Sequence, residues 1–590
     1  MTIRWPLLLL AACGSASHPT PPANKSTAHI ARIEHGLLPG VQVRNEEVRY
    51  ELADRMREFH VPAVSIAVFE HGEVLWTAAF GMADVATGER ATEDTQFLAG
   101  SISKSVNAYA ALLAVRDGAL ALDTPINEAL TSWKLPDNEL TKKTPVTLRM
   151  LLSHTAGTTV HGFPGYEAGE PIPTVPQILD GAPPANTPAV RVDLAPGTEF
   201  RYSGGGITIS QLALVEKTHT PYPELLAARV LGPFGMTRST FDPARAAHPA
   251  VGYGANGREI EGKRHVYPEM AAAGLWTTAG DLARFFARLA HERKDPSSIA
   301  AQMTTKVKDI AGSDQGIGMG VFLMNRNGTA VFGHGGADAG FQADAVASLD
   351  GEFGVVVMTS SEAGFKLMPE IERAVFAEYG WPGADPVVDR VALPDPSKFT
   401  GRFLIGRTPV EITAKDGKLY LAPLFDDAVE LVPIAADKLV RRDDGGMIRA
   451  DATGPVQMTR PGASDGPPIK KLEGPHYLFE LAAGHFDEAV ALLKQHKDDE
   501  PLVNDVGYFL ATRDLEHGIA MLKMAIAAFP DSSNLYDTLG AIYTDAGDKP
   551  HAIAAYEQAI ATCDSDPRYT PQLKAERRKQ AEVQLAKLRK

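Results

Sequence analysis

A chain of 590 residues is too long to fold around one hydrophobic core, so two to four domains are expected. With 44% hydrophobic and 22% charged residues the composition is that of a globular protein, and a formal net charge of −15 argues against a surface for nucleic acid or for an anionic membrane. No apolar run reaches the roughly 18 residues of a membrane-spanning helix.

The first thirteen residues, MTIRWPLLLLAAC, have the layout of a secretory signal, because an early Arg precedes a short apolar run and then small residues. The ending Leu-Ala-Ala-Cys resembles the bacterial lipobox, which implies that residues 1–13 end at a lipidated Cys13. The protein is then expected in the cell envelope, on the periplasmic side or at the outer membrane, touching a membrane only through its lipid anchor. Residues 14–40 are predicted to be a flexible linker. The alternative is an ordinary start with a buried Cys13.

The other cysteine, Cys563, lies in the helical tail, so no disulfide framework is expected when Cys13 is lipidated. The 17 histidines form no H-E-x-x-H motif and the chain has no C-x-x-C motif. We therefore expect neither a metal nor a cofactor.

Residues 41–382 alternate strand and helix patterns. The stretch 61–81 is predicted to be a hairpin that turns at His71-Gly72, since apolar β-branched and aromatic residues flank a glycine turn. The strand FGVVVMTSSE (353–362) follows an Asp-Gly turn and is expected to pair antiparallel with the preceding FQADAVASL. Strands at both ends with helices between them predict an α/β domain.

The stretch GSISKSVNAYAALLAV (100–115) is predicted to begin a helix near Ser101, with Lys104 heading an inward-facing apolar stripe. An amine buried there loses the hydration that favours its charged form and becomes available as a base. Its neighbour one turn away is the Ser101 hydroxyl, which needs a positioned base to act as a nucleophile. The alternative is that Ser101 is only the N-cap of the helix.

Two later segments place polar side chains next to glycines, and a long loop separates them from this helix. Residues 158–196 hold many Pro and Gly without periodicity and are predicted to be a lid or binding loop. PGTEFRYSGGG (196–206) puts Tyr202 at the end of an extended run, before glycines expected to let the backbone approach a ligand. VFGHGGADAGF (331–341) puts His334 at a strand end.

The rest of the chain changes character twice. Short alternating runs over residues 392–462 predict a small antiparallel β domain, and the linker RPGASDGPP ends it. Residues 471–590 are helical and repetitive, with Leu522 and Tyr556 34 positions apart. NLYDTLGAIYTDAGDKPHAIAAYEQAI resembles a tetratricopeptide repeat, which implies a surface where a protein partner could bind. Plain helical hairpins without a groove are the alternative.

Five segments in order, GSISK, LLSHTAG, PGTEFRYS, AAAGLWTTAGDLARF and HGGADAGF, resemble the β-lactamase-related serine hydrolases, which include class C β-lactamases, penicillin-binding-protein-like D-peptidases and esterases. The resemblance covers about 340 residues and implies a β-lactamase/transpeptidase-like fold, an antiparallel sheet flanked by helices. It implies that Ser101 is acylated, that Lys104 is the motif lysine and that Tyr202 shares the acid/base work, which a phenol can do where cations stabilise its phenolate. His154 of LLSHTAG is interpreted as structural, capping its turn.

The third motif of the family matches His334, Gly335 and Gly336, and the resemblance implies an oxyanion hole made by the N–H groups of Ser101 and Ala337. Two positions depart from β-lactamases. Gly204 replaces the Asn that ends the second motif, and His334 replaces a Lys, so a fixed positive charge becomes one that is partial near pH 7. Both departures favour an esterase or peptidase over a β-lactamase.

The sequence therefore predicts a secreted serine hydrolase that acylates Ser101 and hydrolyses an ester, an amide or a D-amino-acid peptide bond. The alternative function is a catalytically weak or inactive lipoprotein scaffold that binds protein partners through its helical repeats.

Overall fold

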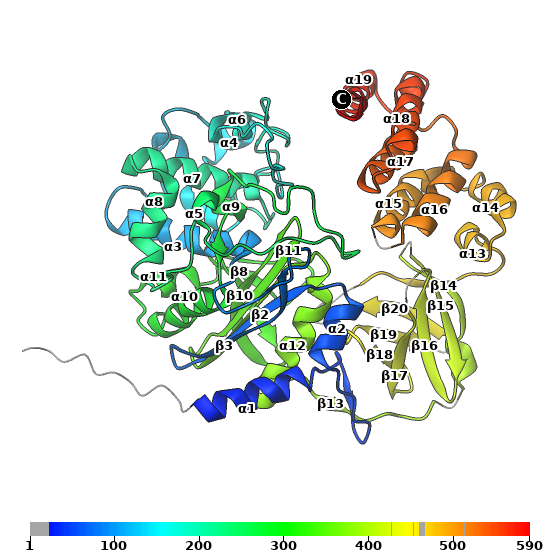
Figure 1. Cartoon of the computed structure of the whole chain (residues 1–590), viewed down its shortest axis with the longest axis horizontal. Coiled ribbons are helices and arrows are strands. Elements are labelled where there is room, and N and C mark those ends of the chain that lie inside the picture. The colour runs from blue at the N-terminus through cyan, green and yellow to red at the C-terminus, as the bar shows by residue number, and fades with distance from the viewer. Residues whose placement is uncertain are drawn as a thin grey trace, which may run out of the picture.

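The computed structural model describes residues 23–393, 395–406, 408–425, 427–451, 454–459, 466–512 and 514–589. The predicted signal with its lipidated Cys13, and residues 14–22 of the predicted linker, lie outside the described residues. Figure 1 shows three parts: a large sheet with helices on both sides, a smaller β domain, and a set of helices at the C-terminal end.

The large sheet is antiparallel and runs in the order β4-β3-β2-β12-β11-β10-β9-β8-β7. The prediction of an antiparallel sheet flanked by helices is confirmed. The hairpin expected over 61–81 is also confirmed, since β2 pairs with β3 and Glu70 faces Glu73 across a turn in which His71 has φ +51°. The pairing of β11 with β12 is as expected. The strands are β2 (Ala63–Glu70), β3 (Glu73–Asp84), β4 (Glu89–Arg90), β7 (Lys308–Asp309), β8 (Gly316–Ile317), β9 (Phe322–Arg326), β10 (Thr329–Asp338), β11 (Phe341–Ser348) and β12 (Phe353–Thr359).

Both faces of the sheet are buried, because side chains alternate along each strand. On β2, Val64, Ile66 and Val68 pack in one cluster with α12 (Gly364–Tyr379). Ala67 and Phe69 pack in the other cluster with the helices of the opposite side. Figure 1 shows α1 and α12 on one side of the sheet and α3 and α10 on the other.

Helix α1 (Ala23–Glu34) corrects the expectation of a flexible linker over residues 14–40. Its Ile33 is buried in the cluster that contains α12, and His29 stacks on the Tyr379 ring with 4.7 Å between centroids. Arg32 and His29 both form ion pairs with Glu378. The Ser, Pro and Ala content of this stretch suggested a tether, but one amphipathic helix within it has a surface to pack against.

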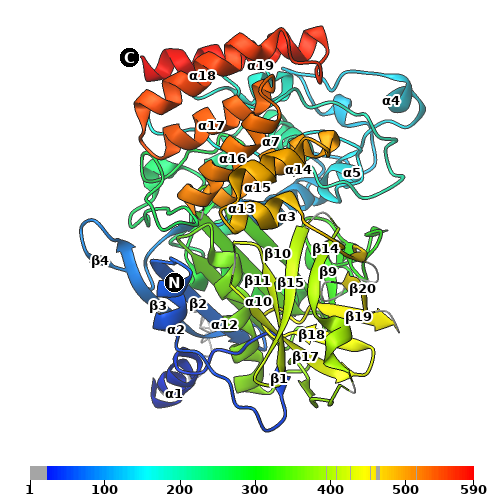
Figure 2. The same cartoon turned by 90° about the vertical axis from the view of Figure 1, so that its right-hand side faces the viewer.

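The helices of the other side build the region around Ser101. Helix α3 (Ser103–Arg116) is buried on all sides from Ser103 to Ala114, so the prediction of a single inward-facing stripe was wrong: the helix runs through the core. Figure 2 shows α3 at the level of the sheet's upper end. The remaining helices on this side are α4 (Glu139–Lys143), α5 (Leu148–Leu152), α6 (Val175–Asp180), α7 (Gly204–Thr218), α8 (Tyr222–Leu226), α9 (Met270–Ala273), α10 (Ala279–Glu292) and α11 (Ile299–Met303), and α2 (Leu52–Glu58) lies beside α12.

The small β domain is an antiparallel sheet in the order β20-β19-β18-β17-β16-β15-β14-β21, and a bridge between Gln457 and Pro468 brings its two edges together as in a barrel. It extends past the predicted boundary at 462, because β21 follows the linker stretch. Its strands are β14 (Gly401–Ile405), β15 (Thr408–Lys415), β16 (Lys418–Pro423), β17 (Val429–Ala435), β18 (Lys438–Arg441), β19 (Met447–Asp451), β20 (Gly454–Thr459) and β21 (Ile469–Lys471).

A short segment ties the first domain to the β domain. Strand β1 (Gln42–Val43) pairs in parallel with β13 (Val387–Val388), and Val43 packs with Val432 of the β domain. Glu46 accepts hydrogen bonds from Arg390 and Arg442, and the Arg390 bonds contribute most to lowering the pKa of Glu46 to about 2.

The C-terminal helices form three antiparallel hairpins and a last helix, stacked above the β domain in Figure 2. Within the third hairpin a Cβ on Gly540 would lie 3.0 Å from the Tyr556 ring, so glycine lets the two helices pack closely. Phe425 of the β domain contacts His517, and Lys587 lies 3.4 Å from Glu170 of the first domain. Among the described residues no helix is long and apolar enough to cross a membrane. The helices are α13 (Tyr477–Ala482), α14 (Phe486–Leu493), α15 (Glu500–Ala511), α16 (Leu515–Ala528), α17 (Ser533–Asp545), α18 (Lys549–Cys563) and α19 (Pro571–Leu588).

Candidate active site

Ser101 and Lys104 lie in direct contact. Ser101 is half-buried in a single 3-10 turn, Gly100–Ile102, that leads into α3. The Lys104 Nζ is 2.8 Å from the Ser101 Oγ and also donates a hydrogen bond of 2.7 Å to the carbonyl of Ala272. The residue at the N-cap of α3 is Ile102, which makes no side-chain capping bond, so the N-cap interpretation of Ser101 is not supported. The arrangement holds a buried amine against the hydroxyl of a half-buried serine.

Tyr202 is brought to the same place by the extended run before α7. The Lys104 Nζ lies over its ring, 5.0 Å from the centroid. The ring stacks on His154 with a centroid distance of 4.3 Å, and it lies 4.9 Å from the His161 ring. The sequence predicts that Ser101, Lys104 and Tyr202 act in one site, although Tyr202 lies about a hundred residues further along the chain. The structure brings the three side chains together.

His154 supports Tyr202 rather than capping its own turn. Its side chain is buried, its φ is +55°, and its Nδ1 accepts the backbone N–H of Ser203 at 3.1 Å. Burial, with Lys104 nearby, lowers the pKa of His154 well below its usual value, so the ring is neutral. Sequence reasoning interpreted His154 as structural but missed this contact, because nothing in LLSHTAG points to residue 203.

His334 lies within β10 rather than at a strand end, and its side chain is buried. The carbonyl of Gly335 can only accept, so the Nδ1 at 2.5 Å from it carries the proton and the Nε2 is an acceptor, with no partner among the described residues. Burial, reinforced by Lys104, lowers the pKa of His334 to about 3. The expectation that His334 carries a partial positive charge near pH 7 was therefore wrong, since the imidazole is neutral there.

The strand that carries His334 meets the turn that carries Ser101 backbone to backbone. A Cβ on Gly336 would stand 1.9 Å from the Ala99 carbonyl oxygen and 3.2 Å from the Ser101 nitrogen. A Cβ on Gly100, whose φ is +51°, would stand 2.5 Å from the Ala337 nitrogen. The N–H groups of Ser101 and Ala337, predicted as oxyanion-hole donors, therefore belong to adjacent stretches of backbone.

The glycines after Tyr202 have another role than the one expected. Gly204–Gly206 begin α7, and a Cβ on Gly204 would stand 2.9 Å from the Phe163 ring. These glycines let the helix start pack against the 158–196 loop instead of opening the backbone to a ligand. An Asn at position 204 would displace Phe163. The packing around Gly204 therefore leaves no space for the side-chain amide that β-lactamases carry at this position.

Most of the predicted loop over residues 158–196 is irregular, and its first part lies beside Tyr202. Thr158 bridges to Val192, Tyr166 bridges to Val266, and the Ser203 hydroxyl donates to the Thr159 carbonyl. Together with the His161 contact, these bonds place the loop at the border of the candidate site, where it can shape a substrate pocket.

Glu269 is a buried carboxyl that the sequence did not single out. It directly precedes α9, whose Ala272 holds Lys104, and neither carboxyl oxygen has a partner among the described residues. Burial raises the pKa of Glu269 to about 7. The neutral acid is thus the form that the fold favours.

Relative to a Glu269→Gln variant, the wild-type protein is expected to lose ~3 kcal/mol of unfolding free energy as the pH rises from 4.5 to 7. Below the unfolded-state pKa of 4.5 both states bind the proton, and between the two pKa values only the folded state does. Urea unfolding of both proteins from pH 4 to pH 8 measures this. The exposed Glu73→Gln is the matched control. Parallel pH curves for wild type and Glu269→Gln would contradict the prediction.

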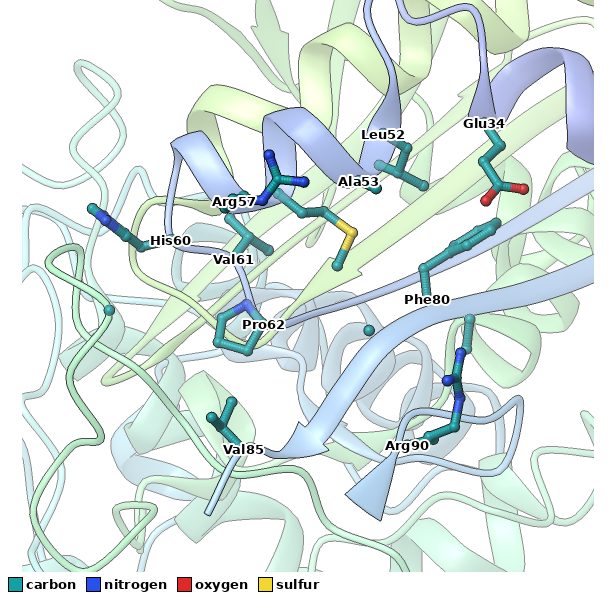
Figure 3. A pocket seen from close by; sticks show the side chains of 14 residues that line it. Glu34, Leu52, Ala53, Arg57, His60, Val61, Pro62, Phe80, Val85 and Arg90 are labelled. Carbon is teal, nitrogen blue, oxygen red and sulfur yellow. The ribbon is translucent and has the colours of Figure 1, made fainter. Parts of the chain in front are cut away.

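Within the described residues no group of three or more His, Cys, Asp or Glu side chains could hold a metal ion. A separate pocket of about 510 Å³ lies between α2 and β3 (Figure 3). Apolar side chains such as Met56 and Phe80 line it, with Arg57 and Arg90 nearby, and none of Ser101, Lys104, Tyr202 and His334 does. This pocket is therefore not part of the candidate active site.

Comparison with known proteins covers the same region. Residues 49–378, more than half of the chain, match the family model described as Beta-lactamase. A D-aminopeptidase of Cereibacter sphaeroides is 26% identical over 323 residues, which are 52% of this chain and 58% of that protein. Esterase EstB of Burkholderia gladioli is 30% identical over 211 residues, 34% of this chain and 52% of the esterase.

Penicillin-binding protein 4 of Amycolatopsis lactamdurans is 29% identical over 197 residues, 33% of this chain and 49% of that protein. The chain thus spans about half the length of the curated relatives it matches. The solved structure of an octameric penicillin-binding protein homologue from Pyrococcus abyssi aligns with a TM-score of 0.47 at 21% identity, covering 71% of this chain and 98% of that one.

Proposed function

Because the chain belongs to the beta-lactamase family, we propose that it is a serine hydrolase that acts through an acyl-enzyme on Ser101. The observation that carries the proposal is the contact between the Lys104 Nζ and the Ser101 Oγ at 2.8 Å, within the distance needed for proton transfer. The bond from Lys104 to the Ala272 carbonyl fixes the amine toward the hydroxyl.

In the proposed reaction the Lys104 Nζ takes the proton of Ser101 as the Ser101 Oγ forms a bond to the substrate carbonyl carbon. The negative charge that develops on the carbonyl oxygen is held by the N–H groups of Ser101 and Ala337. The bond to the leaving group then breaks, and that group departs with a proton delivered by Lys104 or Tyr202. A water molecule repeats the attack on the ester at Ser101, releases the acid and restores the hydroxyl.

The substrate class that fits this site is an ester, an amide or a D-amino-acid peptide rather than a β-lactam. A β-lactam antibiotic carries a carboxylate, and the buried, neutral His334 offers it no charge. Gly204 provides no side-chain amide, and Phe163 lies where one would begin. The relatives named as a D-aminopeptidase and an esterase support the same choice.

A panel of chromogenic substrates tests this proposal. We expect turnover of short-chain esters or of D-aminoacyl anilides, and at most slow hydrolysis of a chromogenic cephalosporin. Ser101→Ala protein, assayed in parallel, sets the background. Efficient cephalosporin hydrolysis would overturn the substrate assignment, and equal rates for wild type and Ser101→Ala would favour the scaffold alternative.

We also propose that the protein is secreted and anchored by a lipid on Cys13, and that its C-terminal hairpins bind a protein partner in the manner of tetratricopeptide repeats. The sequence pattern around Cys13 supports the first point, and three stacked helical hairpins support the second. Labelled fatty acid is expected to enter the wild type and not Cys13→Ala. Incorporation into both would exclude the anchor.

A further inference from the structure

We infer that the aromatic side chains around Tyr202 form a subsite for an aromatic group of the substrate, and that Phe322 determines this specificity. The inference rests on the proposed function, in that Ser101 is taken as the acylated residue. Three segments far apart in the chain supply the rings: His161 from the loop over residues 158–196, Tyr202 from the run before α7, and Phe322 from the start of β9.

The rings surround Tyr202 at the spacing of interacting aromatic side chains, roughly 4.5 to 7 Å between centroids. The Phe322 ring is nearly parallel to the Tyr202 ring, with an interplanar angle of 14° and 6.2 Å between the centroids. The His161 ring lies 4.9 Å from the Tyr202 ring. Phe322 also meets two rings edge to face, that of Phe200 at 6.1 Å and that of His334 at 5.1 Å.

These rings differ from the rings of the hydrophobic core, because part of their surface is free. Phe200, Tyr202 and Phe322 are half-buried and His161 is exposed, whereas Phe332 on the neighbouring strand β10 is fully buried. Ligand sites are lined mainly by apolar and aromatic side chains with a few polar groups. A group of partly exposed rings beside the candidate nucleophile and base therefore indicates a surface that an apolar part of the substrate covers.

Phe322 has a fixed position relative to Lys104, because the stretch before β9 packs on α3. The Ser105 hydroxyl donates a hydrogen bond of 2.6 Å to the Gly320 carbonyl. A Cβ on Gly320, whose φ is +75°, would stand 2.5 Å from the Ala108 Cβ, so the two segments are in close contact. A ring that is already held in place loses little conformational entropy when a ligand packs on it, which favours selection by shape.

An aromatic group is the occupant that these rings favour. Aromatic pairs in offset or edge-to-face arrangements gain free energy beyond the burial of area, so a phenyl group is preferred to a cyclohexyl group of similar volume. Tyr202 is needed for proton transfer in the proposed reaction. Phe322 is therefore the ring at which the selectivity is tested without removing an acid or a base.

The experiment measures kcat/KM, by titration of the released acid, for two matched pairs of esters. Ethyl phenylacetate against ethyl cyclohexylacetate varies the acyl part, and benzyl acetate against cyclohexylmethyl acetate varies the leaving group. In one of the pairs we expect the wild type to prefer the phenyl compound about tenfold, the size expected for one aromatic pairing. Phe322→Leu, which keeps an apolar side chain without the ring, is expected to reduce this preference to about twofold or less, and Phe322→Tyr to keep it.

Phe486→Leu is the matched control, because Phe486 is also a partly exposed phenylalanine, 39% exposed, and begins α14 in the C-terminal helices, away from α3 (Figure 1). It is expected to leave kcat/KM for all four esters within about threefold of wild type. A merely structural role of Phe322 would lower both members of a pair equally and leave their ratio unchanged.

The ratio in the wild type tests the inference even where a variant fails to fold. No preference for the phenyl compound in either pair, or the same preference in Phe322→Leu as in the wild type, would overturn the inference. Equal rates for the wild type and Ser101→Ala would instead refute the proposed function.

Discussion

Ser101→Ala and Lys104→Ala are each expected to lower kcat/KM for a small ester by about four orders of magnitude, and the double variant is expected to cost little more. The reason is the single contact of 2.8 Å between Nζ and Oγ, because a base without its nucleophile, or a nucleophile without its base, leaves the same residual rate. Steady-state kinetics on the four proteins of the cycle measure the coupling.

Lys104→Ala also loses the bond to the Ala272 carbonyl, so its melting temperature serves as the control for a purely structural effect. Lys104→Met, which keeps most of the side-chain volume, is the matched variant. If the two single losses add in the double variant, the residues act independently and the base assignment fails.

Gly336→Ala is expected to lower kcat by at least about 100-fold, the usual cost of losing an oxyanion donor. Its new methyl group would meet the Ala99 carbonyl oxygen at 1.9 Å, so β10 has to move away from the turn that bears Ser101. The Ala337 N–H moves with the strand. Single-turnover kinetics with an ester measure the rate constant of the acylation step directly.

Gly335→Ala is the matched control for this prediction. The Cβ added there would meet nothing nearer than the Asp344 carboxyl oxygen at 3.7 Å, an ordinary contact, and Gly335 has no positive φ. We expect it to keep activity within about threefold of wild type. Equal losses in the two variants would show that the close approach at Gly336 has no special role.

The parts of the fold that depend on local pattern were predictable from the sequence. The hairpin at His71 and the pairing of β11 with β12 follow from alternation and turn residues, which act over a few positions. The motif around Ser101 and Lys104 also lies within one turn of chain. Tyr202 and His334 were reached only through the resemblance to a family, and not through spacing.

What the sequence could not predict depends on contacts between distant segments. The burial of α3 on all sides and the packing of α1 on α12 are decided by tertiary neighbours. The predicted charge of His334 assumed the usual pKa of a free imidazole. Burial beside Lys104 lowers that pKa to about 3, so the ring is neutral near pH 7. Glu269 sits in a stretch whose pattern gave no sign that its carboxyl group is buried.

The most direct test of the account is the site of covalent modification by a fluorophosphonate probe. Peptide mapping by mass spectrometry is expected to find the wild type labelled on Ser101, Ser101→Ala unlabelled and Lys104→Ala labelled slowly, because the contact with the Lys104 Nζ activates the hydroxyl. Labelling of another residue in the wild type, or an equal rate for Lys104→Ala, would contradict the account.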